Sequence, residues 1–127
     1  MNNQKILVIE DEPDLQEIYQ DVLTEAGFEV EAVEMAEDAL SKLENGSEYK
    51  LILLDLRLPK MTGIEFLRLI RNRHYGYDSM KTVILSGVDM PDIEMITKAC
   101  GAADYWKKVD LMPSDLIEKV TKILNVN

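Results

Sequence analysis

The sequence predicts an α/β fold in which a five-stranded parallel sheet is covered by helices on both faces. Two runs of four aliphatic residues, at positions 6–9 and 51–54, are each followed directly by acidic residues. Unbroken runs of this kind are typical of parallel strands that are buried on both faces. Strand-like runs alternate five times with segments of helical periodicity, which indicates five βα units.

The first half of the chain supplies four elements. The first strand is expected at about residues 5–10. A helix follows from Pro13 to Gly27, because proline suits a first helical turn and glycine commonly ends a helix. Residues 28–33 alternate apolar and acidic side chains, as a half-exposed strand does. A short helix then ends at Gly46, and its apolar residues are Ala36, Ala39, Leu40 and Leu43.

The second half supplies three more strands and three more helices. The strands are expected at residues 50–55, 82–86 and 104–107, with a longer turn at residues 74–78. The fourth helix begins at Pro91. The inward-facing residues of these helices are expected to be Ile64, Leu67 and Ile70 in the third, Ile93, Ile96 and Ala99 in the fourth, and Leu116, Ile117, Val120, Ile123 and Leu124 in the fifth.

The polarity of the strands predicts their order in the sheet. The second strand carries acidic residues and belongs at an edge, whereas the aliphatic first and third strands belong at the centre. This favours the order 2-1-3-4-5, the flavodoxin-like doubly wound arrangement, with five helices and the sheet in three layers. Ligands of such sheets bind at the carboxyl edge, around the switch between strands 1 and 3.

Composition excludes several classes of partner. The chain has 24 acidic and 14 basic residues, a formal charge of −10 and no basic run, so we expect no direct nucleic-acid binding. We expect no membrane association either, since no apolar stretch approaches about 20 residues and no signal peptide precedes the first strand. The single Cys100 fits a reducing compartment. We therefore predict one cytoplasmic domain over residues 1–127, with no output domain after it.

Polar residues gather at the predicted carboxyl edge of the sheet. Glu10 and Asp11 follow the first strand and Asp55 ends the third, and three such carboxylates repel one another unless a cation or a shared proton intervenes. Ser86 ends the fourth strand and Lys108 follows the fifth. Oxygen ligands suit Mg²⁺, and lysine and serine suit phosphoryl oxygens. A central aspartate can attack phosphorus as a nucleophile.

This constellation resembles the receiver domain of bacterial two-component response regulators, and the resemblance covers essentially the whole chain. Any one motif would be weak, but four occur in order on the matching strands. They are the pair Glu10-Asp11, Asp55 with Pro59 four and Gly63 eight residues later, the pair Ser86-Gly87, and residues 101–108 through the fifth strand.

The resemblance implies a role for each acidic residue. Asp55 would accept a phosphoryl group from the phosphohistidine of a sensor histidine kinase or a histidine phosphotransfer protein. Glu10, Asp11 and Asp55 would hold Mg²⁺, or Mn²⁺ in its place, together with the backbone carbonyl of Arg57. The domain would not be an enzyme in the usual sense, because it would catalyse only its own phosphoryl transfer and autodephosphorylation.

The resemblance also implies a switch. Ser86 would move onto the new phosphoryl oxygens, Lys108 would pair with another of them, and the ring of Tyr105 would then turn inward. A downstream protein would read the changed face formed by the fourth helix, the fifth strand and the fifth helix. A phosphorylation-linked homodimer is left open.

Two departures from the family pattern keep a second interpretation open. Val109 stands where the family usually has proline, so the Lys108–Val109 peptide could be cis or trans, and a cis bond before a non-proline residue costs about 2.5–4 kcal/mol. Lys107 is a neighbouring candidate for the lysine role, although the spacing to Ser86 favours Lys108. The alternative function is a degenerate receiver that acts as a phosphorylation-independent interaction module.

Two other classes on related folds are disfavoured. A flavin-binding electron carrier needs a hydroxyl- and glycine-rich phosphate loop after the first strand, whereas residues 10–14 read Glu-Asp-Glu-Pro-Asp and would repel a phosphate. A haloacid-dehalogenase-like phosphatase needs an Asp-x-Asp motif there, and Glu10 occupies the place of its first aspartate.

Overall fold

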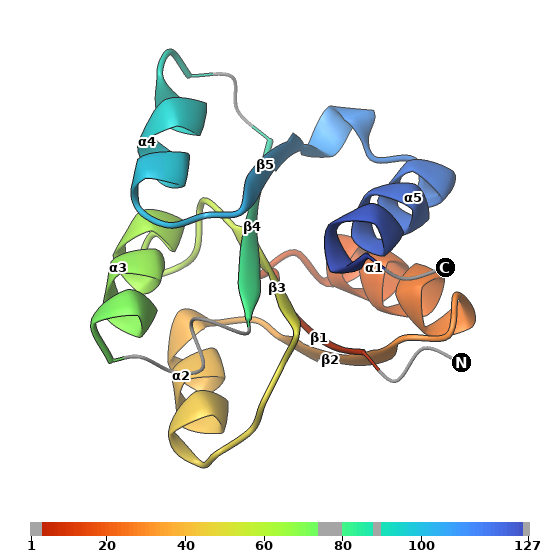
Figure 1. Cartoon of the computed structure of the whole chain (residues 1–127), viewed down its shortest axis with the longest axis horizontal. Coiled ribbons are helices and arrows are strands. Elements are labelled where there is room, and N and C mark those ends of the chain that lie inside the picture. The colour runs from red at the N-terminus through yellow and green to blue at the C-terminus, as the bar shows by residue number, and fades with distance from the viewer. Residues whose placement is uncertain (1–3, 74–79, 88–89, 126–127) are drawn as a thin grey trace.

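A five-stranded parallel sheet forms the centre of the molecule in the computed structural model (Figure 1). The structure describes residues 4–73, 80–87 and 90–125. The strand order is β2-β1-β3-β4-β5, which confirms the order predicted from the polarity of the strands. The turn expected at residues 74–78 lies outside the described residues.

Strands and helices alternate along the chain as predicted. The strands are β1 (Lys5–Ile9), β2 (Glu29–Val33), β3 (Leu51–Asp55), β4 (Lys81–Ser86) and β5 (Asp104–Lys107). The helices are α1 (Pro13–Glu25), α2 (Ala36–Glu44), α3 (Gly63–Arg73), α4 (Ile93–Ala99) and α5 (Pro113–Leu124). A short 3-10 helix, Lys108–Asp110, follows β5 and was not predicted.

Helices α1 and α5 cover one face of the sheet, and helices α2, α3 and α4 cover the other (Figure 1). The side chains of β1 alternate between these two faces, because successive residues of a strand point to opposite faces of a sheet. Leu7 and Ile9 pack in the core under α2 and α3, and Ile6 and Val8 pack in the core under α1 and α5. All five residues of β3 are buried, whereas the edge strand β2 is half-buried to exposed.

The register of the central strands places their carboxyl ends side by side. Ile9 pairs with Leu54 across β1 and β3, and Asp55 pairs with Leu85 across β3 and β4. The residues that follow these strands therefore meet at one edge of the sheet.

Helix α4 differs from the sequence prediction. It begins at Ile93 rather than at Pro91, and Asp92 before it has a left-handed backbone, with φ of 64°. Ile93 and Thr97, one turn apart, are the buried residues of this short helix. Ile96 was expected to face the core but is 42% exposed, because the sheet contacts only the side of the helix that carries Ile93 and Thr97.

A polar network ties the edge strand β2 to its neighbours. Glu31 accepts a hydrogen bond of 2.6 Å from the Tyr49 hydroxyl, and its carboxylate lies 3.0 Å from Lys5 Nζ and 3.2 Å from Lys42 Nζ. The tyrosine hydrogen bond and the two ammonium groups lower the pKa of Glu31 to about 2. The ionised carboxylate is thus the form that this fold stabilises.

No helix among the described residues is both long enough and apolar enough to cross a membrane.

We predict that Glu31 makes the stability of the fold sensitive to acid. Its pKa in the folded chain lies below the ordinary glutamate value of 4.5, so its contribution is complete above pH 4.5 and is lost as the pH falls towards 2. In urea titrations across this range, Glu31→Gln should remove part of the acid-induced loss of stability. The control Glu29→Gln should retain it, because Glu29 is 66% exposed and lies 3.8 Å from Lys5. An unchanged pH dependence in Glu31→Gln would contradict this assignment.

Candidate functional site

Three carboxylates meet at the carboxyl edge of the sheet. Glu10 and Asp11 follow β1 and Asp55 ends β3, and one carboxylate oxygen of each lies within 4.8 Å of the others. Glu10 is 1% and Asp55 6% exposed, whereas Asp11 is open to solvent. The structure therefore brings together the three acids that the sequence placed at this edge, in an arrangement whose donor atoms suit a hard divalent cation.

Lys108, which follows the edge strand β5, reaches into the same pocket. Its Nζ lies 2.7 Å from Glu10 Oε1 and 3.2 Å from Asp55 Oδ2. Lys107 is exposed, so of the two candidate lysines Lys108 is the one at the carboxylates. The Lys108–Val109 peptide is trans, and the 3-10 helix that begins at Lys108 carries Val109 out to 82% exposure.

The burial of Glu10 makes its charge state depend on its neighbours. Burial, with a further contribution from the charge of Asp55, raises the pKa of Glu10 to about 7, and the hydrogen bond from Lys108 acts in the opposite direction. Burial alone would lower the pKa of Lys108, but Glu10 and Asp55 outweigh it and the pKa is raised. The ammonium group therefore stays charged at neutral pH and offsets the negative charge of the pocket.

Local hydrogen bonds fix the orientation of Glu10. The amide of Glu12 donates to Glu10 Oε2 at 3.1 Å, and the side-chain amide of Gln16 donates to the Glu10 carbonyl at 3.0 Å. Sequence reasoning missed Gln16. Its position in the first turn of α1, six residues after Glu10, was the available signal.

The loop after β3 holds Asp55 in place. The amide of Arg57 donates to Asp55 Oδ1 at 3.1 Å, which leaves Oδ2 towards Lys108. Gly63 packs directly against this loop: its amide donates to the Leu56 carbonyl at 2.9 Å, and a Cβ at position 63 would lie 2.9 Å from the Asp55 carbonyl oxygen. This close approach is the physical reason for a glycine eight residues after the aspartate.

Ser86 and Tyr105 lie on the neighbouring strands. Ser86 ends β4 and is 2% exposed, and Tyr105 in β5 is 7% exposed. The tyrosine ring lies in the core cluster that also contains Ile84 and Ile93. The tyrosine ring is therefore buried in this structure, and its role as a switch stays a prediction.

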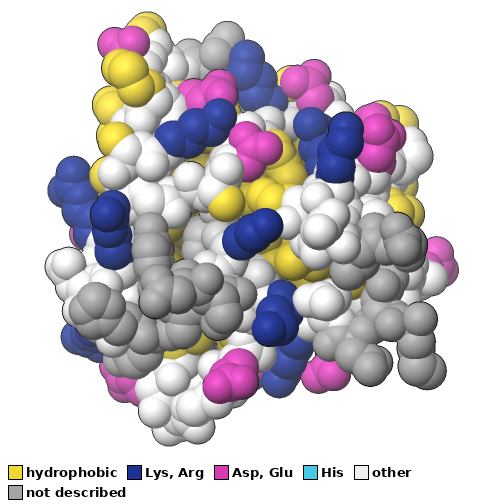
Figure 2. All heavy atoms as spheres, in the orientation of Figure 1, with side chains coloured by type: hydrophobic (Ala, Val, Ile, Leu, Met, Phe, Trp, Pro, Cys, Tyr) yellow, Lys and Arg dark blue, Asp and Glu magenta, His cyan; other side chains and the backbone are white. Residues whose placement is uncertain are grey.

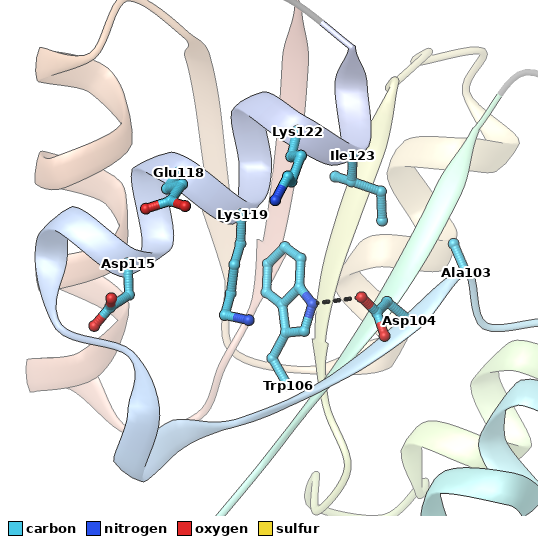
Figure 3. A pocket seen from close by; sticks show the side chains of 8 residues that line it. All are labelled: Ala103, Asp104, Trp106, Asp115, Glu118, Lys119, Lys122 and Ile123. Atoms are coloured by element: carbon cyan, nitrogen blue, oxygen red, sulfur yellow. Dashed lines mark hydrogen bonds between the residues drawn. The ribbon is translucent and has the colours of Figure 1, made fainter.

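A separate groove of about 460 Å³ lies between β5 and α5. Figure 3 shows Trp106 at its floor, with Lys119 beside the indole ring and a hydrogen bond from the ring nitrogen to Asp104. Lys119 Nζ lies 5.7 Å from the ring centre, within the range of a cation–π interaction. This groove contains none of the clustered carboxylates, so the chemistry of the site rests on the pocket around Asp55.

Comparison with known proteins shows a family match over nearly the whole chain. The family model described as "Response regulator receiver domain" matches residues 6–121. The chain is 36% identical over 104 residues to the cell cycle transcriptional regulator CtrA of Caulobacter vibrioides, covering 82% of the chain and 43% of that protein. It is 31% identical over 122 residues to the alkaline phosphatase synthesis transcriptional regulatory protein PhoP of Bacillus subtilis, covering 96% and 49%. The chain thus spans less than half the length of either relative.

Solved structures agree with the fold over most of their length. A CheY-like response regulator receiver domain protein from Methanospirillum hungatei superposes with a TM-score of 0.86 at 28% identity, covering 97% of this chain and 94% of that one. The chemotaxis protein CheY4 of Vibrio cholerae superposes with a TM-score of 0.85 at 26% identity, covering 95% and 98%.

We predict that the contact at Gly63 is needed for stability. Gly63→Ala should lower the free energy of unfolding by about 1–3 kcal/mol, because the new methyl group would overlap the Asp55 carbonyl and the loop would have to shift. Alanine is otherwise the better helix former by about 1 kcal/mol, so a loss isolates the steric effect.

The matched control is Gly87→Ala. A Cβ at position 87 would meet only the Lys108 side chain, at 3.8 Å, an ordinary contact. Chemical denaturation should therefore place Gly87→Ala within about 0.5 kcal/mol of the wild type. Equal stability of the two variants would refute the steric explanation.

Proposed function

Because the chain belongs to the response regulator receiver domain family, we propose that it is a phosphorylatable receiver of a two-component or phosphorelay system, with Asp55 as the phosphoacceptor. The observation that carries this proposal is the pocket itself. A buried aspartate lies beside two further carboxylates and within 3.2 Å of a lysine ammonium group. This combination suits the transfer of an anionic phosphoryl group better than it suits a purely structural ion pair.

The proposed reaction moves one phosphoryl group. A carboxylate oxygen of Asp55 attacks phosphorus, the phosphorus–nitrogen bond of a partner's phosphohistidine breaks, and the imidazole nitrogen keeps the electron pair and takes up a proton. Arg57, through its backbone amide, and Gly63, through its packing, hold the Asp55 loop for this attack.

A divalent cation fits the donor set of this pocket. Glu10, Asp11 and Asp55 would hold Mg²⁺, or Mn²⁺, with the carbonyl of Arg57 as a further ligand. When bound, the cation would supply charge stabilisation for the phosphoryl oxygens. Lys108, now paired with Glu10 and Asp55, would pair with a phosphoryl oxygen once the group is in place.

Ser86 and Tyr105 would carry the change to a protein partner. Both side chains are buried, and Tyr105 in β5 pairs with Ile84, two residues before Ser86 in β4. We expect a hydroxyl that moves towards phosphate to alter the packing around the tyrosine ring. The face of α4, β5 and α5 includes a groove of about 410 Å³ that Tyr105, Met90 and Met95 help to line. A downstream protein would bind there, and phosphorylation could also favour pairing of two copies through it.

We propose the phosphoryl donor, a kinase or phosphotransfer protein, and the downstream target only as classes of partner that suit the chemistry of this pocket and face. Because the chain spans under half of the regulators compared above, the activity of the whole protein is part of this proposal, as is a cytoplasmic location. The rival function, a receiver-like module that binds without phosphorylation, makes a different prediction for the same experiment.

We predict that acetyl phosphate with Mg²⁺ adds the mass of one phosphoryl group to the intact chain, and that Asp55→Asn abolishes this shift. The matched control is Asp38→Asn, an exposed acid in α2, which should be modified like the wild type. Intact-mass spectrometry at neutral pH makes the comparison. A wild-type chain that never gains the mass would support the phosphorylation-independent module, and a shift that persists in Asp55→Asn would move the acceptor to another residue.

A further inference from the structure

The turn between β1 and α1 carries two of the three clustered carboxylates. Glu10 and Asp11 follow β1, and Glu12 precedes the first residue of α1. Glu10 is 1% exposed, whereas Asp11 and Glu12 are open to solvent. The position of the Asp11 carboxylate relative to that of Glu10 therefore depends on how this short turn is held.

The sheet and the pocket hold Glu10 at its amide and at its side chain. The Glu10 amide donates to the Val33 carbonyl of β2 at 3.0 Å. Its Oε1 lies 2.7 Å from Lys108 Nζ, and its Oε2 accepts a hydrogen bond of 3.1 Å from the Glu12 amide. The Glu10 carbonyl is the group that sets the direction in which the chain leaves the sheet towards Asp11.

Gln16 of α1 holds that carbonyl. Its side-chain Nε2 donates to the Glu10 carbonyl at 3.0 Å, in a partly buried hydrogen bond. Its own amide donates to the Glu12 carbonyl at 3.0 Å. One helical residue thus bonds to both ends of the turn and holds the peptide between Glu10 and Asp11 against α1.

The start of α1 makes this contact important. Helices commonly begin with a Ser, Thr, Asp or Asn side chain that accepts a hydrogen bond from the first turn. The corresponding residue here is Glu12, and its side chain makes no such bond. Pro13 fixes the φ angle of the first helical residue but does not fix the turn that precedes it. The hydrogen bonds of Gln16 supply that restraint.

Charge alone does not make an ion site of this turn. Lys, Arg, Asp and Glu side chains are interspersed over the face that Figure 2 shows, and the whole chain carries a formal charge of −10. Such a chain attracts cations in general. A specific Mg²⁺ site also needs oxygen ligands that are held in place, because this ion demands near-ideal octahedral geometry.

We propose that Gln16 is a positioning residue of the acidic pocket, whose side-chain amide fixes the peptide between Glu10 and Asp11 so that both carboxylates are in place before a divalent cation binds. This role rests on the proposed function, in which these two acids help to hold Mg²⁺. The hydrogen bonds that Gln16 donates go to backbone carbonyls. Gln16 therefore acts through Glu10 and not on the phosphoryl group.

Calorimetric titration of Mg²⁺ into the full chain tests this role in Gln16→Met and Gln16→Leu. Both substitutions remove the hydrogen-bond donor, leave the charge unchanged and suit a helix as well as glutamine does. Each should weaken Mg²⁺ binding by about tenfold, the lower end of the range for groups that orient metal ligands. Weakening by only one of the two would assign the effect to packing and would overturn the proposal.

The matched control is Gln20→Met. Gln20 lies one turn further along α1 and is half-buried like Gln16, so the same atoms change at a place away from the turn. The control should bind Mg²⁺ within about twofold of the wild type, as expected for a substitution outside any special contact. An equal loss of affinity in Gln20→Met would count against a specific role of Gln16.

Two further measurements separate positioning from a general structural effect. In the chain without Mg²⁺, hydrogen exchange of the Glu12 amide should be faster in Gln16→Met, while exchange within β1 should match the wild type. With acetyl phosphate, the Mg²⁺ concentration for half-maximal modification should rise about tenfold. The rate at saturating Mg²⁺ should stay within about twofold, because Asp55 and Lys108 are unchanged. A lower saturated rate with an unchanged half-maximal concentration would contradict positioning.

The wild type distinguishes a failure of this role from a failure of the proposed function. If the wild type binds Mg²⁺ and is modified at Asp55 while both Gln16 variants keep its affinity, Gln16 is not a positioning residue and the proposed function stands. A wild type that binds no Mg²⁺ would overturn both.

Discussion

Charge balance at the carboxyl edge of the sheet is the constraint on which the rest of this structure depends. Parallel strands deliver Glu10, Asp11 and Asp55 to one place, and their carboxylate oxygens approach within 4.8 Å. Two of these side chains are almost fully buried, where an uncompensated negative charge is costly. The ammonium group of Lys108, 2.7 Å from Glu10 and 3.2 Å from Asp55, supplies the compensation. Under the function we propose, a pocket balanced in this way would accept a cation and a phosphoryl group by exchanging partners rather than by unfolding.

The elements around the pocket connect it to the surface of the molecule. Gly63 lets the start of α3 lie directly against the Asp55 loop. A movement of that loop would therefore displace the start of the helix. Ser86 ends β4, and Tyr105 in β5 pairs with Ile84 of β4 and lies in the core cluster that contains Ile93 of α4. Trp106, the next residue, packs on the opposite face under α5. β5 thus contacts the cores beneath both α4 and α5, which is the arrangement that a switch between pocket and surface requires.

Much of this could be predicted from the sequence, because the strongest signals were local. The aliphatic runs before Glu10 and Asp55 predicted central parallel strands, and parallel strands must place their final residues at one edge. Lys108, which spacing favoured over Lys107, is the lysine whose ammonium group lies at the carboxylates. The pairing of Lys108 with Glu10 was not predicted, since it joins residues 98 positions apart and depends on the 3-10 turn after β5.

Helix α4 shows where periodicity fails. Ile96 fits the apolar pattern, yet a helix of seven residues contacts the sheet through only one narrow side, here Ile93 and Thr97. Which side that is depends on the backbone at Asp92 and on packing against β5, and neither is encoded in the spacing of apolar residues. Ile96 is therefore exposed and lines a groove between α3 and α4, which the apolar pattern did not predict.

Calorimetric titration of Mg²⁺ into the wild-type chain and into Lys108→Met tests the central claim most directly. If the ammonium group and the cation neutralise the same carboxylates, the wild type should bind one Mg²⁺ per chain and Lys108→Met should bind it more tightly, while Lys107→Met behaves as the wild type. Absence of Mg²⁺ binding by the wild type, or an identical affinity in Lys108→Met, would contradict the account.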